Sequence, residues 1–259
     1  MNCRLCGADA ELQNSHIIPE FIYKPLYDKK HRFMKISFNP DKKVQLPQKG
    51  LREYLLCHSC ETKLSQNEKY VSEFIYGEKQ CKSILRGNRI YIQGLDYKKV
   101  RLCYLSILWR MSIASSNMFK NVSLGSKHEE RLRNLILNDD PGLSNQYGFW
   151  CCAPQIDGIF HSDLILPPIR SRVEGHITYW IVIGGFLYIF FVSSQSIHPD
   201  IVKYFIQDNG EWIIKKKDAS KIPYIVDMLK RILRADEIRK HFAPKMRRYP
   251  KHFCLGFFI

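Results

Sequence analysis

The chain has 259 residues, of which 45% are hydrophobic and 25% charged. It is therefore long enough and apolar enough to bury a sizeable core in one or two domains, and its composition is that of a soluble globular protein. The net charge is +15, with a pI near 9.4. This excess favours a polyanionic partner, nucleic acid before an anionic membrane surface. The alternative is a basic surface that only keeps the protein soluble.

Four of the nine cysteines form two Cys-x-x-Cys pairs at the two ends of the first sixty residues. Two such pairs supply the four thiolates of a tetrahedral structural zinc, and the predicted ligands are Cys3, Cys6, Cys57 and Cys60. No signal peptide precedes Cys3, so we expect a reducing cytoplasm, where such pairs hold metal instead of forming disulfides. The other five lie among apolar residues and are expected to be buried thiols: Cys81, Cys103, Cys151, Cys152 and Cys254.

The segment 21–50 combines many basic side chains with interleaved aromatic ones. This mixture suits a nucleic acid, because cations bind phosphates and rings stack on sugars or bases. The predicted DNA-binding residues are Lys29, Lys30, Arg32, Lys42 and Lys43. A solvated loop whose aromatic residues pack on the zinc site is an alternative that is compatible with DNA binding.

Apolar residues at helical spacing after the second cysteine pair predict a helix that Gly77 ends, and a domain boundary at residue 78. The segment 79–259 is then a second, α+β domain of unknown role. In it we expect a short strand over 89–93, a helix over 100–115, a helix over 129–138 that opens on a capping box at Ser126, and strands over 147–152 and 156–160.

An uncharged run over 177–192 is shorter than a bilayer requires and is divided by Gly184-Gly185. It predicts two buried strands joined by a tight turn, and no membrane segment. A further hairpin is expected over 204–215 around Asp208-Asn209-Gly210, so the sheet is predicted to be antiparallel. A C-terminal amphipathic helix is expected over 222–243. The apolar tail 253–259 is expected to dock on the core or on a partner, which leaves a homo-oligomer or a partner protein open.

His16 lies between the cysteine pairs, in the string His16-Ile17-Ile18-Pro19, and the second pair follows a leucine and opens a helix. This order resembles the four-cysteine branch of the HNH endonuclease family over roughly residues 1–75. The resemblance implies an N-terminal zinc-stapled ββα-metal module over 1–78 in an α+β chain. It also implies that a histidine at the end of the first strand activates water as general base, that a divalent ion stabilises the charge on the phosphate, and that the zinc is structural.

Carried onto this sequence, the resemblance makes His16 the general base. The family's aspartate ligand is replaced by Ser15, its asparagine aligns near Arg52, and its last histidine aligns with Glu61. Arg52 can hold a phosphate, and Glu61 offers a hard oxygen to a catalytic Mg²⁺ or Mn²⁺. The predicted catalytic residues are therefore His16, Glu61 and Arg52.

Two functional hypotheses follow. The first is a metal-dependent endonuclease that hydrolyses the phosphodiester bonds of DNA, and the family analogy extends it to defence against foreign DNA. The second is a catalytically impaired, zinc-stabilised protein that binds nucleic acid or acts as an adaptor. The residues found at Ser15, Arg52 and Glu61 favour the second hypothesis, whereas the position of His16 between the cysteine pairs favours the first.

Overall fold

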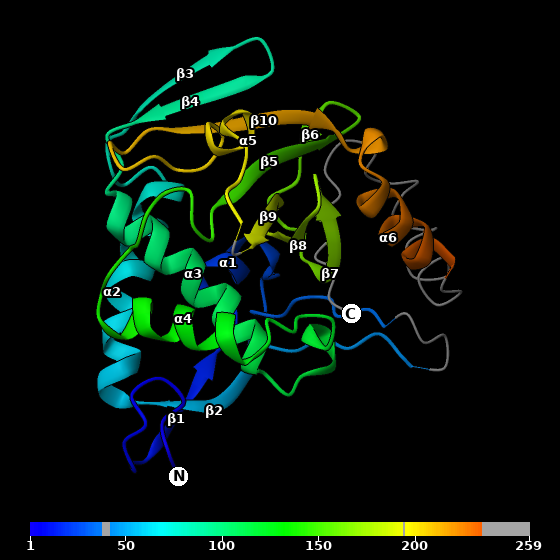
Figure 1. The fold of residues 1–259 in the computed structure, drawn as a ribbon. Helices are drawn as coiled ribbons and strands as arrows, with labels where there is room; N and C mark the ends of the chain where they lie inside the picture. The colour runs from blue at the N-terminus through cyan, green and yellow to red at the C-terminus, as the bar shows by residue number, and fades with distance from the viewer. Residues whose placement is uncertain (38–41, 194, 235–259) are drawn as a thin grey trace.

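A computed structural model describes residues 1–37, 42–193 and 195–234. Figure 1 shows a small N-terminal sheet and three long helices on one side of the molecule, next to a large twisted sheet. A further helix covers the opposite face of that sheet. The predicted α+β class is confirmed.

The N-terminal sheet is an antiparallel pair of strands, β1 (Leu12–His16) and β2 (Arg52–Cys57). Leu12 lies opposite Cys57, and His16 lies opposite Arg52 at the other end of the pair. The helix α2 (His58–Ile75) begins directly after β2 and ends just before Gly77, whose φ of +76° is readily adopted only by glycine. The order of these elements is thus strand, strand, helix.

The chain between β1 and β2 is mostly irregular. It begins with the short helix α1 (Glu20–Tyr23) and the 3₁₀ helix η1 (Lys24–Leu26). The Tyr23 side chain is fully buried, and its hydroxyl accepts a hydrogen bond from the Leu51 amide at 3.1 Å. Its ring occupies the space where a Cβ on Gly50 would stand, only 2.5 Å away. Tyr23, near the start of this segment, therefore packs against and bonds to residues 50–51 at its end.

The next elements are the long helix α3 (Tyr97–Ile113), the 3₁₀ helix η2 (Asn117–Phe119) and the helix α4 (Ser126–Leu137). α3 begins at Asp96, whose carboxylate accepts a hydrogen bond from the Lys99 amide, and it is buried from Val100 to Met111. α4 forms where predicted, but Gly125 is its N-cap and no side chain caps it, so the predicted capping box at Ser126 is wrong.

The large sheet contains β3 (Lys82–Arg86), β4 (Arg89–Gln93), β5 (Phe149–Ile156), β6 (Ile159–Phe160), β7 (Leu166–Val173), β8 (His176–Ile183), β9 (Phe186–Val192) and β10 (Trp212–Asp218). Their order across the sheet is β3-β4-β10-β5-β9-β8-β7, with β6 paired to β5. All the pairs are antiparallel except β10 with β5, which is parallel. The prediction of a purely antiparallel sheet is therefore wrong at this one pair.

The hairpin predicted over 204–215 does not form. A tight turn is present, since the Gly210 amide donates to the Gln207 carbonyl at 2.9 Å, but no strand precedes it. The segment before the turn instead contains the helix α5 (Pro199–Val202), and β10 pairs with the sequence-distant strands β4 and β5. The predicted turn is therefore present, but the strand that follows it pairs with strands that are distant in the sequence and not with the segment before the turn.

The hairpin predicted over 177–192 is confirmed as β8 and β9. Gly184 and Gly185 form its turn, with φ of +58° and +78°. A Cβ on Gly185 would lie 2.0 Å from the His161 carbonyl oxygen, so the neighbouring loop also requires glycine here.

Helices cover both faces of the large sheet. Buried residues of α3 pack with one face, and α6 (Pro223–Arg234), after the 3₁₀ helix η3 (Ala219–Lys221), packs with the other. The predicted C-terminal helix is therefore present from residue 223, whereas 235–243, Cys254 and the tail 253–259 lie outside the described residues. Of the four other predicted thiols, Cys103 and Cys151 are buried, and Cys81 and Cys152 are partly buried.

One cluster of buried apolar side chains extends from Cys3 to Ile214 and includes α2, α3 and the large sheet. Packing is therefore continuous across residue 78, where the domain boundary stays a prediction. Within the described residues, no helix has the length and apolar character needed to cross a membrane.

Candidate functional site

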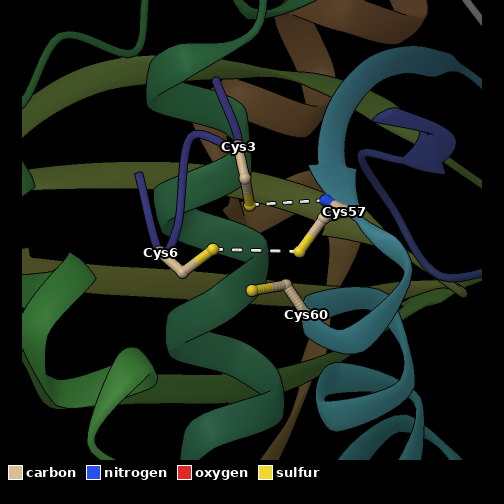
Figure 2. Close-up of side chains that lie close together, drawn as sticks. All are labelled: Cys3, Cys6, Cys57 and Cys60. Atoms are coloured by element: carbon tan, nitrogen blue, oxygen red, sulfur yellow. Dashed lines mark hydrogen bonds between the residues drawn. The ribbon is translucent and has the colours of Figure 1, made fainter. Parts of the chain in front are cut away.

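The four predicted zinc ligands converge on one point. Figure 2 shows that the side chains of Cys3 and Cys6, from the N-terminal turn, face those of Cys57 and Cys60, from the start of α2. The four sulfur atoms lie within 4.8 Å of one another. Main-chain hydrogen bonds shape the N-terminal turn, in which the Cys3 amide donates to the Ala8 carbonyl at 2.8 Å and the Gly7 amide donates to that of Cys3 at 2.8 Å.

This arrangement fits a tetrahedral metal ion such as zinc. A Zn–S bond of about 2.3 Å places neighbouring sulfur atoms about 3.8 Å apart in a tetrahedron, and the Cys6 and Cys57 sulfur atoms are 3.8 Å apart. The Cys57 amide also donates to the Cys3 sulfur at 3.3 Å, and such bonds stabilise thiolate charge. A hydrogen bond with the Ser59 hydroxyl, first among several causes, lowers the pKa of Cys57 to about 6.

His16 is the last residue of β1 and lies at the opposite end of the hairpin from Cys57. Strand alternation directs its neighbour Ser15 inward, so Ser15 is fully buried, while the side chain of His16 is 20% exposed. The structure brings His16 together with Arg52, the residue opposite it in the strand pair. The Ser15 hydroxyl donates to the Gln13 carbonyl at 3.3 Å.

Glu20 is the residue of this site that the sequence analysis did not find. One of its carboxylate oxygens, Oε2, lies 2.6 Å from Nε2 of His16 and 3.6 Å from a terminal nitrogen of Arg52. The other oxygen accepts a hydrogen bond from the Tyr27 hydroxyl at 2.5 Å. The only signal for Glu20 was its i+4 spacing from His16 across Pro19, the residue from which α1 begins.

Nε of Arg52 is a buried donor that has no hydrogen bond among the described residues. Nε2 of His16 and Oε2 of Glu20 satisfy each other, since they lie 2.6 Å apart. Buried polar groups are almost always satisfied by protein, water or a ligand. The guanidinium of Arg52 therefore retains a donor that a polar ligand can use.

The surroundings of His16 keep its ring neutral near pH 7. Burial and then the positive charge of Arg52 lower its pKa below the usual 6.5, against the opposing charge and hydrogen-bonding effect of Glu20. A neutral imidazole has a free nitrogen lone pair, which a general base requires.

A buried arginine of α3, Arg110, contacts the main chain of His16. One terminal nitrogen of Arg110 donates to the His16 carbonyl at 2.7 Å, and the other pairs with a carboxylate oxygen of Glu68, on α2, at 2.6 Å. Arg110 is 1% exposed. Burial raises the pKa of Glu68 despite the opposing effect of Arg110. Sequence analysis did not find Arg110, because nothing local distinguishes it from the outer face of a surface helix.

The other predicted site residues are dispersed. Glu61 is half-buried in the first turn of α2, and its negative charge contributes to the raised pKa of Glu68. Arg32 pairs with Asp28 at 2.8 Å. The remaining predicted DNA-binding residues are exposed: Lys29, Lys30, Lys42 and Lys43. Among the described residues, the four cysteines are the only group of three or more His, Cys, Asp or Glu side chains close enough to hold a metal ion.

No family model, curated protein or solved structure matches this chain. Its function is therefore inferred from the side chains at the two ends of the β1–β2 hairpin.

Proposed function

We propose that the protein is a metal-dependent DNA endonuclease of the HNH type. The observation that carries this proposal is the convergence of His16, Glu20 and Arg52, with an unsatisfied donor on Arg52, at the end of a strand-strand-helix unit whose other end holds four cysteines. This places a candidate base, a carboxylate and a phosphate-binding cation at one point. The net charge of +15 supports a polyanionic substrate.

In this proposal each of the three side chains has a role that its position supports. Because Nε2 of His16 faces Glu20, its proton points to the carboxylate, which leaves the lone pair on Nδ1. Nδ1 takes a proton from water as the water oxygen attacks phosphorus, and the bond to the bridging oxygen breaks. Arg52 binds a non-bridging phosphate oxygen. Tyr27 and Arg110 are positioning residues, because they hold the Glu20 side chain and the His16 main chain.

The residues fit a loosely held Mg²⁺ or Mn²⁺. Such ions often take only one or two protein carboxylates and keep several waters. Glu20 offers a carboxylate whose two oxygens also contact His16 and Tyr27, and Glu61 stays a second predicted ligand. When bound, the ion would neutralise charge on the phosphate and the leaving oxygen.

The test is nicking of plasmid DNA by highly purified protein with Mg²⁺ or Mn²⁺. We expect cleavage that EDTA stops and that His16→Ala lowers by about 10²–10⁴-fold, the usual contribution of a general base. His198→Ala is the matched control, since this histidine is 64% exposed and far along the chain. Cleavage that persists unchanged in the His16 variant would remove His16 from the mechanism.

A second candidate function is nucleic-acid binding without catalysis, as a scaffold or adaptor. The observation that favours it is the lack, among described side chains outside the cysteine cluster, of a group of three metal ligands. It predicts salt-sensitive DNA binding and no cleavage with any divalent ion. Turnover that depends on both metal and His16 excludes it.

A further inference from the structure

A large basic cavity lies beside the proposed active site. Its volume is about 930 Å³, and it is enclosed by the loop before β2, the η2 region, β7 and α6. Among the described residues that line it, the cations are Lys35, Lys42, Lys43, Lys120 and Arg231, and the one acid is Asp227. Asp227 already pairs with Arg231 at 2.9 Å. In the described part of the chain, no ion pair engages the four lysines, so their charge is available to an anion.

The cavity reaches the end of the β1–β2 hairpin where His16 lies. Leu51 lines it and directly precedes Arg52, and the Leu51 carbonyl accepts a hydrogen bond from the Ile17 amide at 3.0 Å. On the other side, Ser116 lines the cavity, and its amide donates to the Glu53 carboxylate at 2.9 Å. Both neighbours of Arg52 along the chain, Leu51 and Glu53, thus contact or form the cavity wall.

We propose that this cavity binds the phosphate backbone of DNA next to the phosphodiester that Arg52 holds. Several unpaired lysines suit several phosphates, because each neutralised phosphate releases condensed counterions. Lysine makes point-charge contacts that do not distinguish bases, so the cavity positions a strand and reads no sequence. The inference rests on the proposed function for the identity of the cleaved bond, but not for binding itself.

The assignment adds to the residues that sequence analysis predicted. Lys42 and Lys43 were expected to bind DNA, and the structure places them across one cavity from Lys120, which follows η2 about eighty residues later. Lys29 and Lys30 do not line it. The substrate-binding surface is therefore built jointly by the long loop before β2 and by the second part of the chain.

The experiment measures the binding of a fluorescent DNA duplex to the full-length protein without added Mg²⁺ or Mn²⁺, over about 50–200 mM salt. The variant Lys42→Gln/Lys43→Gln/Lys120→Gln removes three exposed charges. We expect weaker binding, and a slope of log affinity against log salt that is shallower by about 2–3, near 0.9 for each lost phosphate contact. With divalent metal, its KM for DNA should rise more than its kcat falls.

The charge-matched control is Lys69→Gln/Lys82→Gln/Lys127→Gln, which removes three exposed lysines outside the cavity. Its salt slope should remain close to that of the unmodified protein. Equal slopes for the two triple variants, or a cavity variant that loses duplex RNA but not DNA, would overturn the proposal. His16→Ala should bind DNA normally. If no protein cleaves DNA but only the cavity variant loses binding, the nuclease proposal fails and the cavity assignment stands.

Discussion

At the scale of single residues, Glu20 and Arg52 have opposite effects on the protonation of His16. Arg52 lowers the pKa of His16, Glu20 raises it, and burial, the largest effect, lowers it. A general base acts when deprotonated, so cleavage should fall as the pH drops through this pKa, which lies below 6.5.

We therefore predict opposite shifts in the acid limb of the pH–rate profile. Glu20→Gln removes a charge that favours the imidazolium, so the limb should move to lower pH. Arg52→Met removes a charge that disfavours it, so the limb should move to higher pH. Both variants should also lose rate, which is why the position of the limb is the measurement that matters. Shifts in the same direction would contradict the assignment of His16 as the titrating base.

The same residues show how far sequence reasoning reached. His16 and the four cysteines were predictable because their spacing along the chain fixes their chemistry. Glu20 was missed because it lies four positions after His16, beyond Pro19, and only the turn into α1 brings the two side chains together. Arg110 lies 94 residues from His16 in the sequence, and local sequence patterns do not predict contacts between residues so far apart.

At the scale of elements, the ion pair between Arg110 and Glu68 joins β1, α2 and α3. We predict that Arg110→Met destabilises the fold by about 3–5 kcal/mol, because it leaves a buried carboxylate without its partner. Adding Glu68→Leu should recover much of this loss. The control is Lys69→Met, which removes an exposed pair with Glu73 on the same helix and should cost less than about 1 kcal/mol. Urea unfolding measures all four proteins.

The pH dependence of that loss has a definite sign. Burial raises the pKa of Glu68 in the folded state, so the folded protein binds this proton more tightly than the unfolded chain does. Removing Arg110 raises this pKa further. The destabilisation in Arg110→Met should therefore shrink as the pH falls through the raised pKa. A loss that does not change between about pH 4 and pH 8 would assign the destabilisation to packing alone.

Elements also show where sequence patterns stop being informative. The run of apolar residues over 177–192 predicted its hairpin because both strands and the Gly-Gly turn are contiguous. The sequence predicted part of Trp212–Asp218 as a strand but did not predict its partner strands. Its parallel pairing with β5 involves residues about sixty positions earlier, which no local pattern indicates.

At the scale of the whole molecule, the continuous core couples the cysteine cluster to the large sheet. All four tryptophans, Trp109, Trp150, Trp180 and Trp212, lie beyond residue 100. Their fluorescence therefore reports on the second part of the chain. We predict one cooperative unfolding transition, which tryptophan fluorescence and far-UV circular dichroism detect at the same temperature.

Zinc removal should move that transition. A strong chelator, or Cys60→Ser, should lower the melting temperature seen by tryptophan, because metal binding contributes to folding free energy. Cys81→Ser is the matched control, since Cys81 is only partly buried and lies outside the cluster. If the melting temperature measured by tryptophan fluorescence does not change when the metal is lost, the chain instead contains two independent domains with a boundary near residue 78.

The place of β10 in the sheet has a consequence for how the protein is made. It is the last strand in the described chain, yet it lies between β4 and β5 near the middle of the sheet. During synthesis, the edges of β4 and β5 that later pair with β10 remain without a partner strand until residues 212–218 have left the ribosomal exit tunnel. Exposed edges invite pairing with other chains. Completion of the sheet therefore follows the emergence of residues 212–218, and chains that terminate before residue 212 lack the strand that joins its two halves.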